Sequence, residues 1–479
     1  MSAQLSRMFK AYDVRGLAPG ELDAEVAYAV GAGFADVVVV PEARPGDRPR
    51  AVLGADMRPS GGPLADAFAA GLTARGADVV RLGLTSTDEM YYAAGSLDVP
   101  GVMVTASHNP APYNGFKLCR AGARPVARGS GLDAVRDAAE LHLRGTASPH
   151  PAAPGRTDHQ DVLGGYAAFL RSLVDLSDVR PLTVVVDAGN GMAGLTTPAV
   201  LGEAAGLPGL PVTVIPLHFT LDGTFPNHEA NPTRPENLED LRRAVLEHGA
   251  DVGLAFDGDA DRCCVVDETG TPVSPSALTV LVGLREIERE RAAGREPTIV
   301  HNLISSRAVP ELLGAAGARL VRTRVGHADV KAAMARHGAV FGGEHSAHYY
   351  FRDFYCVDSG MLAALHLLAT VGAQDRPLSA LVRDLDPYSA SGEIDHVVPD
   401  VAGARARILE AYVRRVDAPP VEVDELDGLT VSSWAPGSGW WFNVRASNTE
   451  PLVRLNVEAT SDDVMQDVRE TVLRLLAVG

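Results

Sequence analysis

One stretch decides how the chain is interpreted: Val102-Met103-Val104-Thr105-Ala106-Ser107-His108-Asn109-Pro110. Its apolar start is typical of the end of a buried strand in a parallel sheet, and hydroxyl, imidazole and amide groups follow. In open α/β sheets, ligands gather at the carboxyl ends of such strands. We therefore expect Ser107 on a strand-end loop, where its hydroxyl can meet a substrate. A polar turn shaped by Asn109 and Pro110 explains the stretch equally well. The rest of the chain must decide between a functional loop and a structural turn.

Predicted strands and helices alternate on both sides of this stretch. A helix near 63–75 lies between strands near 51–54 and 77–82, and the alternation continues to about residue 341. Such alternation is typical of parallel βαβ units. From about residue 385 the pattern changes to strands and hairpins, followed by an amphipathic helix. The sequence therefore predicts an α/β protein with a separate C-terminal α+β module.

Length and composition set further bounds. A chain of 479 residues exceeds the usual limit of a single core, so we expect three or four domains. The segment 145–157, rich in Pro, Ala and Gly, is interpreted as a linker between the first two. The glycine-rich turn at 187–194 is similar to a dinucleotide fingerprint, but we interpret it as structural because lone glycine patterns are weak evidence.

The charge and the apolar pattern exclude several classes of partner. The formal net charge of -18 argues against nucleic acid and anionic membrane surfaces. No apolar run approaches the roughly 18 residues of a membrane helix, and Lys10 comes too early for a secretory signal. The cysteines lack CxxC spacing, which is typical of reduced thiols. We expect a cytoplasmic protein in which an anionic substrate needs a locally basic cleft.

Lysine is rare in this chain. It occurs only at Lys10, Lys117 and Lys331, so arginine provides nearly all of the Lys and Arg side chains in the chain. Arginine cannot release a proton at ordinary pH, whereas lysine can. Lys117 follows Ser107 by ten residues and is therefore a candidate for chemistry.

Three carboxylates follow another predicted buried strand, in Asp257-Gly258-Asp259-Ala260-Asp261-Arg262. Alternate residues of an extended loop point the same way, so these carboxylates would repel one another and raise their pKa values. An all-oxygen set of this kind suits Mg²⁺. An EF-hand is excluded because no helices flank this loop, as that motif requires. The alternative is a solvated acidic turn.

Two further polar clusters follow predicted strands. In Arg445-Ala446-Ser447-Asn448-Thr449-Glu450-Pro451-Leu452-Val453-Arg454, guanidinium groups frame short hydrogen-bonding side chains, which suits a phosphate. An ordinary turn between strands is the alternative. In 342–348, Glu344, Ser346 and His348 suit the hydroxyls of a sugar. His327 is a potential proton-transfer group, although an isolated histidine is more often structural.

Taken together, these parts resemble the phosphomannomutase/phosphoglucomutase group of the α-D-phosphohexomutase family. Six motifs occur in the family's order along nearly the whole chain: YDVRG at 12–16, TASHNP at 105–110, NGFK at 114–117, DGDADR at 257–262, GEHSAH at 343–348 and RASNTEP at 445–451.

The resemblance implies three similar mixed α/β domains and a C-terminal α+β domain around a central active-site cleft. We place the domains at residues 1–155, 156–256, 257–380 and 381–479, with the metal loop at the start of the third. The resemblance implies a phosphoserine at Ser107 and a Mg²⁺ ion held by Asp257, Asp259, Asp261 and a phosphoserine oxygen. Ser107 would exchange its phosphoryl group with a hexose phosphate through a 1,6-bisphosphosugar.

Motif by motif, the resemblance also implies roles for the remaining candidates. Lys117, Arg15 and His327 would transfer protons and neutralise charge around Ser107. The residues that would bind substrate are Tyr12, Arg262, Arg324, Glu344, Ser346, His348, Arg445, Ser447, Asn448, Thr449 and Arg454. Arg324 is included because Ile304 stands where relatives often carry a lysine, and Arg324 or His327 would compensate for that lost phosphate contact.

Other functions remain open at this point. A phosphoglucosamine mutase is the nearest alternative, although such relatives usually carry Gln where His345 stands. A Mg²⁺-dependent sugar phosphatase would keep the aspartates without a remote phosphate cradle, and a non-catalytic binding protein would not need Ser107. The motifs do not separate mannose from glucose. The partners we expect are hexose phosphates and a hexose 1,6-bisphosphate activator, bound by a monomer or homodimer.

Overall fold

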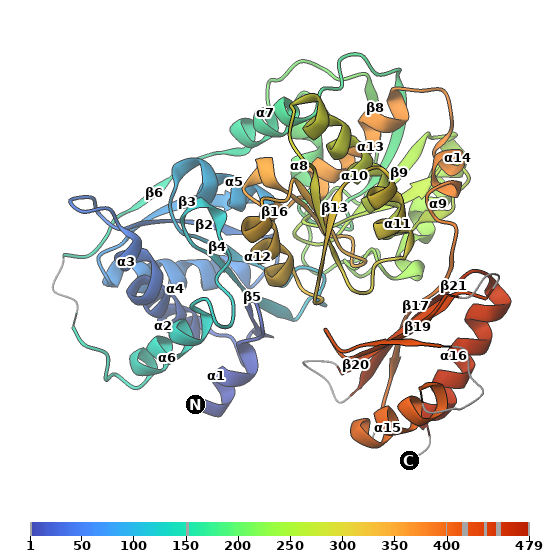
Figure 1. Cartoon of the computed structure of the whole chain (residues 1–479). Helices are drawn as coiled ribbons and strands as arrows, with labels where there is room; N and C mark the ends of the chain where they lie inside the picture. The colour runs from blue at the N-terminus through green and yellow to red at the C-terminus, as the bar shows by residue number, and fades with distance from the viewer. Residues whose placement is uncertain are drawn as a thin grey trace.

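The computed structural model describes residues 2–149, 153–398, 400–413, 420–434, 438–446 and 452–477. Within these residues the strands form four sheets, which follow one another along the chain. Figure 1 shows the N-terminal units in blue and green, the third in yellow, and the C-terminal unit in red beside the third. The expected α/β class with a C-terminal α+β unit is confirmed.

The first sheet has the strand order β1-β5-β4-β2-β3-β6. Its central strands are parallel, while β5 returns antiparallel to β4 and pairs with β1. Its elements are α1 (Ser2–Met8), β1 (Val14–Leu17), α2 (Ala24–Phe34), a π-helical turn (Ala35–Val39), α3 (Val40–Glu42), β2 (Arg50–Ala55), α4 (Gly61–Ala74), β3 (Asp78–Leu84), α5 (Thr87–Leu97), β4 (Gly101–Val104), β5 (Tyr113–Cys119), α6 (Leu132–Leu143) and β6 (Thr157–His159).

The second sheet has the order β11-β10-β9-β7-β8. Here β7 lies parallel to β8 and β9, and β10 returns antiparallel to β9. Its elements are α7 (Leu163–Leu173), β7 (Leu182–Asp187), α8 (Ala193–Val200), β8 (Val212–Leu217), α9 (Glu239–His248), β9 (Val252–Phe256), β10 (Cys263–Asp267) and β11 (Pro272–Val273).

The third sheet has the order β13-β12-β14-β15-β16. Here β12 lies parallel to β13 and β14, and β15 returns antiparallel to β14. Its elements are α10 (Pro275–Ala292), β12 (Thr298–Asn302), α11 (Ala308–Ala315), β13 (Arg319–Thr323), α12 (His327–His337), β14 (Phe341–Gly343), β15 (Tyr349–Phe351), β16 (Val357–Asp358), α13 (Gly360–Gly372) and α14 (Leu378–Arg383).

These three sheets share one topology. Each contains a central strand with a parallel neighbour on either side, and one of those neighbours turns back as an antiparallel hairpin. The hairpin loops are 105–112 between β4 and β5, 257–262 between β9 and β10, and 344–348 between β14 and β15. The three sequence motifs that predicted catalytic, metal-binding and sugar-binding residues therefore occupy the same topological position in three similar units.

Two predicted boundaries differ from this arrangement. The loop 257–262 joins two strands of the second sheet, so it does not open the third unit as expected. The apolar run at 263–267 pairs back on β9 because it completes that hairpin. At the other boundary, β6 pairs with β3, which carries the first sheet past residue 155. We propose that the first unit ends after β6 and the second after β11.

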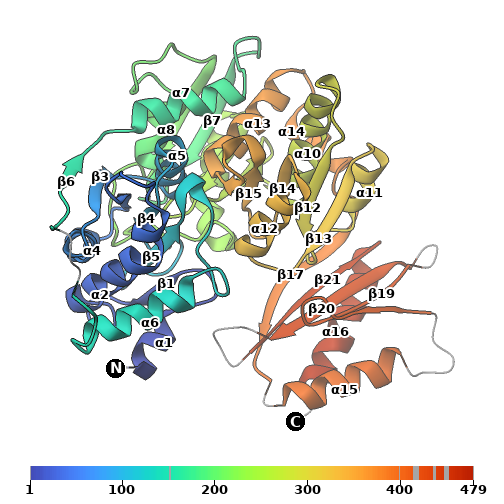
Figure 2. The same cartoon turned by 60° about the vertical axis from the view of Figure 1, so that its left-hand side comes forward.

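The fourth sheet is antiparallel throughout, in the order β17-β21-β20-β19-β18. Trp440 stacks on Phe442 and Trp441 is buried, so both tryptophans are packing residues. Figure 2 shows β17 leading from the third unit into this sheet. The elements are β17 (Ser389–His396), α15 (Val401–Tyr412), β18 (Glu422–Asp424), β19 (Leu429–Ser433), β20 (Trp440–Ala446), β21 (Val453–Ala459) and α16 (Asp462–Ala477).

One apolar helix corrects the sequence interpretation. Among the described residues, Ala24–Glu42 has the length and mean hydropathy (1.5) to cross a membrane, although no such run was expected. Most of it is buried, because α2 packs against α4 and α6 in the core of the first unit. Its apolar character is therefore explained by packing inside the protein.

Candidate active site

Hairpin loops from the first and second units meet at Ser107. The Ser107 Oγ lies 2.7 Å from Asp257 Oδ2, and both side chains are buried. The backbone N–H of Thr87, at the start of α5, donates to Asp259 O at 3.0 Å, which is a second contact between the first unit and the aspartate loop. Arg262 forms a backbone bridge with His348 of the third unit. Residues predicted from separate motifs are thus brought to one place.

Local contacts fix the backbone conformation around Ser107. Ser107 has a positive φ of 51°, an uncommon conformation for a residue with a side chain. Its N–H donates to Thr105 Oγ1 at 2.8 Å, which holds this conformation. Across the junction, a Cβ on Gly258 would lie 2.6 Å from Ser107 O, so only glycine allows the two loops to approach this closely.

The three aspartates of the loop 257–262 form one buried cluster, with one ligand atom from each within 4.8 Å of the others. Burial, together with the charges of Asp259 and Asp261, raises the pKa of Asp257 well above its usual value. Burial would also raise the pKa of Asp259, but Lys117, together with Thr87 and Arg15, lowers that pKa below its usual value.

Lys117 bridges two of these carboxylates. Its Nζ donates to Asp259 Oδ2 at 2.7 Å and to Asp261 Oδ2. Burial alone would lower the pKa of Lys117, but the two carboxylates raise it above its usual value. The side chain is therefore a protonated ammonium beside Ser107's loop. This arrangement agrees with the selection of Lys117 from the scarcity of lysine in the chain.

The aspartate cluster fits a hard divalent cation. Asp259 Oδ1 and Asp261 Oδ1 are buried without a hydrogen-bond partner among the described residues. Buried carboxylate oxygens are costly to leave unpaired, and an all-oxygen set is what Mg²⁺ prefers. The donor set therefore supports a metal site, as the sequence predicted.

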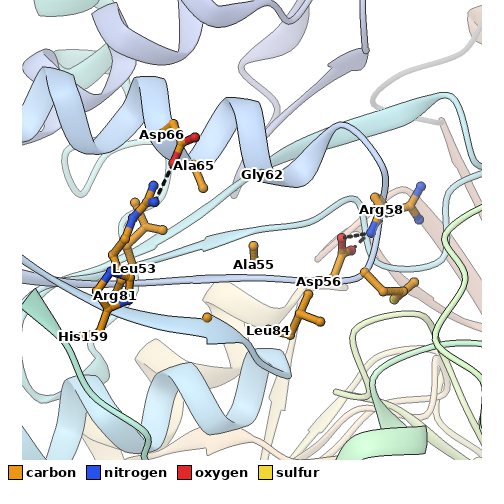
Figure 3. A pocket seen from close by; sticks show the side chains of 12 residues that line it. Leu53, Ala55, Asp56, Arg58, Gly62, Ala65, Asp66, Arg81, Leu84 and His159 are labelled. Atoms are coloured by element: carbon orange, nitrogen blue, oxygen red, sulfur yellow. Dashed lines mark hydrogen bonds and ion pairs between the residues drawn. The ribbon is translucent and has the colours of Figure 1, made fainter.

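A buried ion pair that sequence reasoning missed supports the Ser107 loop. The Arg58 and Asp56 side chains have no exposed surface and pair at 3.2 Å (Figure 3). Arg58 donates to four backbone carbonyls of the loop: Ser107 O at 2.8 Å, Asn109 O at 2.7 Å, and Pro110 O and Tyr113 O at 2.9 Å.

Asp56 contributes to the same support. It accepts from Thr105 Oγ1 at 2.7 Å, and burial raises its pKa to about 6. In Figure 3 the Asp56–Arg58 pair lies at one end of a pocket of about 230 Å³, and the Arg81–Asp66 pair lies at the other. Arg58 and Asp56 therefore position the loop and do not contact the Ser107 hydroxyl.

Two predicted arginines also lie beside Ser107. Arg15 donates to Ala106 O at 3.0 Å and to Asn109 Oδ1, on either side of the serine. Arg262 donates to His108 Nδ1 at 2.9 Å and lies 3.7 Å from Asp257. Burial and Arg262 hold the pKa of His108 well below its usual value, so its Nδ1 can accept this bond.

The third unit contributes a carboxylate held by several donors. Glu344 Oε1 accepts from the N–H of Gly326 at 3.0 Å, while Oε2 accepts from Tyr350 at 3.0 Å and from Ser346 at 3.3 Å. The Glu344 side chain is buried at the hairpin between β14 and β15. Its orientation is fixed, which suits a group that recognises hydroxyls.

Tyr12 and His327 meet where the first unit contacts the third. Their rings pack edge to face with centroids 4.7 Å apart, and Tyr12 donates to Val325 O at 3.2 Å. Burial raises the pKa of Tyr12 to about 12 and holds that of His327 well below its usual value. His327 is therefore a neutral imidazole. Arg324 nearby is exposed.

A second buried network links the metal loop to the third unit. His348 Nδ1 lies 3.7 Å from Asp261 Oδ1 and 2.9 Å from Asp358 Oδ2. Lys331 pairs with Asp358 at 2.7 Å and donates to Tyr91 OH at 3.3 Å. The sequence interpretation did not assign Asp358 or Lys331, although Lys331 carried the same signal as Lys117: it is one of three lysines.

The C-terminal unit presents the two arginines of the predicted phosphate cradle side by side. Arg445 and Arg454 are cross-strand partners on β20 and β21, and both pair with Glu393 of β17. The other predicted cradle residues, Ser447, Asn448 and Thr449, lie outside the described residues. Ile304 is buried against Leu303 and Trp441, where the third unit meets the fourth.

Comparison with known proteins adds independent evidence. Family models for phosphoglucomutase/phosphomannomutase match the chain in order: alpha/beta/alpha domain I at residues 6–137, domain II at 165–270, domain III at 275–388 and the C-terminal domain at 406–475. The match to domain II includes the aspartate loop, in agreement with the second sheet.

Individual relatives are similar over almost their whole length. A phosphomannomutase of Salmonella montevideo is 39% identical over 98% of this chain and 98% of its own. A phosphomannomutase of Escherichia coli K12 is 38% identical over 98% of each chain. The crystal structure of a phosphoglucomutase/phosphomannomutase family protein from Burkholderia thailandensis is 30% identical, with a TM-score of 0.84 over 98% of this chain and 97% of that one.

Proposed function

The chain belongs to the phosphoglucomutase/phosphomannomutase family and is a phosphohexomutase, an isomerase of carbohydrate metabolism, and on that premise we propose a specific reaction. The enzyme interconverts the 6-phosphate and the 1-phosphate of mannose or glucose through a phosphoserine at Ser107. One observation carries this proposal. The Ser107 hydroxyl lies 2.7 Å from a carboxylate of the candidate metal cluster, on a loop that Arg58 holds by four carbonyls.

The proposed reaction moves a phosphoryl group twice. In the first step the bond from Ser107 Oγ to phosphorus breaks, a bond from the sugar hydroxyl to phosphorus forms, and the hydroxyl proton passes to a basic group. The resulting 1,6-bisphosphosugar turns over and returns its other phosphoryl group to Ser107. A serine that serves as a carrier in this way needs surrounding positive charge, because charge stabilisation dominates phosphoryl transfer.

The surroundings of Ser107 support this chemistry. Lys117 and Arg15 are cations whose nitrogens contact the two loops that meet there, and His327 is a neutral imidazole. Asp257, Asp259 and Asp261, with a phosphoserine oxygen, would hold Mg²⁺. When bound, that ion supplies charge that offsets the charge on the transferring phosphoryl group.

The remaining roles belong mainly to residues of the third and fourth units. We assign Glu344, Ser346 and His348 to sugar hydroxyls, and Tyr12, Arg262 and Arg324 to the surrounding wall. Arg445 and Arg454, with Ser447, Asn448 and Thr449, are assigned to the phosphate that is not reacting. A hexose 1,6-bisphosphate activator would load Ser107. We propose a cytoplasmic location, in keeping with the free cysteines.

One assay tests the activity. The purified protein is incubated with mannose 1-phosphate, Mg²⁺ and a trace of glucose 1,6-bisphosphate, and the products are resolved by phosphorus NMR. We expect mannose 6-phosphate as the product. Glucose 1-phosphate and glucosamine 1-phosphate are tested as substrates in parallel reactions. Release of free phosphate would support a phosphatase and no turnover would support a binding protein, and either result contradicts the proposal. A clear preference for glucosamine 1-phosphate would replace the proposed substrates.

Removal of the metal is expected to abolish turnover. Chelation with EDTA followed by dialysis should lower kcat at least 100-fold, and added Mg²⁺ should restore it. Mg²⁺ should also raise the Tm, because an ion that binds only the folded state stabilises it. The Asp259→Asn variant should lose both responses, since it removes one of the clustered carboxylates. Asp98→Asn, at an exposed position, is the matched control. Full activity in metal-free protein would contradict the assignment.

A further inference from the structure

A second cluster of metal-ligating side chains lies in the second unit, outside the catalytic site. Asp187 ends β7, His218 follows the neighbouring strand β8, and His228 lies in the long loop beyond. One ligand atom from each lies within 4.8 Å of the other two. We propose that these three residues bind one Zn²⁺ ion. This site goes beyond the proposed function and does not depend on it.

Each histidine of this cluster has one nitrogen engaged by a second partner. His228 Nδ1 lies 2.9 Å from Glu229 O, and its Nε2 lies 3.0 Å from Asp187 Oδ2. His218 Nε2 lies 3.1 Å from Asp240 Oδ2, which leaves Nδ1 as the nitrogen with a lone pair. A metal-bound histidine almost always donates its other N–H to a carbonyl or carboxylate in this way.

The carboxylate of the cluster is oriented by the backbone. Asp187 Oδ1 accepts from the N–H of Gly189 at 2.8 Å, so Oδ2 is the oxygen that faces His228. All three ligands therefore have their own supporting contact, which is the pattern of a built site rather than of side chains that meet by chance.

The donor set selects the metal. Two imidazole nitrogens and one carboxylate oxygen suit Zn²⁺, whereas Mg²⁺ prefers oxygen ligands alone. The two histidine side chains are about one sixth exposed, at 17% and 16%, so a water molecule can complete a tetrahedral site. The chain thus has two clusters of different chemistry: an all-carboxylate set for Mg²⁺ and a mixed set for Zn²⁺.

The position of the cluster indicates what the ion would do. Asn190 donates its N–H to His218 O at 2.9 Å, which joins the ends of β7 and β8. The same turn backs the aspartate loop, because Met192 donates to Gly258 O at 2.9 Å and a Cβ on Gly191 would lie 2.7 Å from that oxygen. A bound ion would therefore brace the turn on which the Asp257–Asp261 loop rests.

Calorimetry on the full-length protein tests the proposal. The protein is stripped with EDTA, dialysed, saturated with Mg²⁺ and titrated with Zn²⁺. We expect the wild type to bind one Zn²⁺ per chain, and His228→Gln to bind it with an affinity at least 100-fold lower. Asp240→Asn removes only the partner of His218, so its affinity for Zn²⁺ should fall by about 10- to 100-fold, the range for changes beyond the metal ligands. His159→Gln, an exposed histidine on β6, should bind Zn²⁺ as the wild type does.

Two further measurements keep the result decisive. Asp257→Asn should still bind Zn²⁺, so loss of binding in that variant, with binding retained in His228→Gln, would place the ion at the catalytic cluster and overturn the proposal. If His228→Gln does not fold, anomalous diffraction at the zinc edge from wild-type crystals replaces it. A peak between Asp187, His218 and His228 is expected, and a peak only elsewhere, or no Zn²⁺ uptake at all, overturns the proposal.

Discussion

Replacing Ser107 with alanine is expected to lower kcat by about 10⁴-fold or more, because no other hydroxyl at this position can carry the phosphoryl group. The fold should survive. Alanine has the same Cβ as serine, and the loss of the hydrogen bond to the buried Asp257 carboxylate costs about 1–3 kcal/mol. The measurements are mutase turnover and the midpoint of urea unfolding.

The same variant tests the carrier role directly. Intact mass of the wild type, after exposure to glucose 1,6-bisphosphate, should show a fraction one phosphate heavier, and Ser107→Ala should not. Ser96→Ala, on α5 of the same unit, is the matched control and should retain both the adduct and the activity. An adduct that persists in Ser107→Ala, or one that never forms in active wild-type protein, would rule out the phosphoserine.

Replacing Arg58 with alanine is expected to destabilise the first unit by about 3–5 kcal/mol, because Asp56 would remain as a buried carboxylate without its partner. Four carbonyls of the Ser107 loop would lose their donor as well. Misplacement of the nucleophile by about 1 Å can cost 100-fold in rate, so kcat should fall by about that factor even in the folded fraction.

Two companion variants separate charge from geometry. Arg58→Lys keeps the charge but lacks the planar fork that reaches several carbonyls, so it should recover stability in part while kcat remains low. Arg44→Ala removes an exposed arginine that pairs with Asp98, and should change stability by less than about 1 kcal/mol. Wild-type kcat in Arg58→Ala would show that the Ser107 loop holds its shape without this support.

The sequence was sufficient to identify the candidate site residues that stand in consecutive motifs. Ser107 and the three aspartates follow apolar runs that could be recognised as strands, and the order of the motifs indicated the four-unit architecture. Lys117 was found because lysine is rare in this chain. The same argument would have singled out Lys331, which the structure pairs with Asp358.

Other features could not be read from local pattern. Arg58 acts on carbonyls about fifty residues further along the chain, and an arginine after a strand carries no mark of such contacts. The short strand β10 was an apolar run like any other, and periodicity does not say which sheet takes it. Its pairing with β9 is what moved the aspartate loop into the second unit.

The shared topology of the first three sheets has a historical consequence. If one ancestral unit was copied twice in tandem, each copy inherited a hairpin loop at the same place, and each loop then specialised separately: one carries the serine, one the aspartates, and one the carboxylate Glu344. Because the candidate residues are divided among these units, an isolated copy would hold the sheet scaffold but only part of the site. This division also means that insertions elsewhere in a unit leave these hairpins in place, so new specificities can arise by lengthening the connections rather than by redesigning the catalytic core.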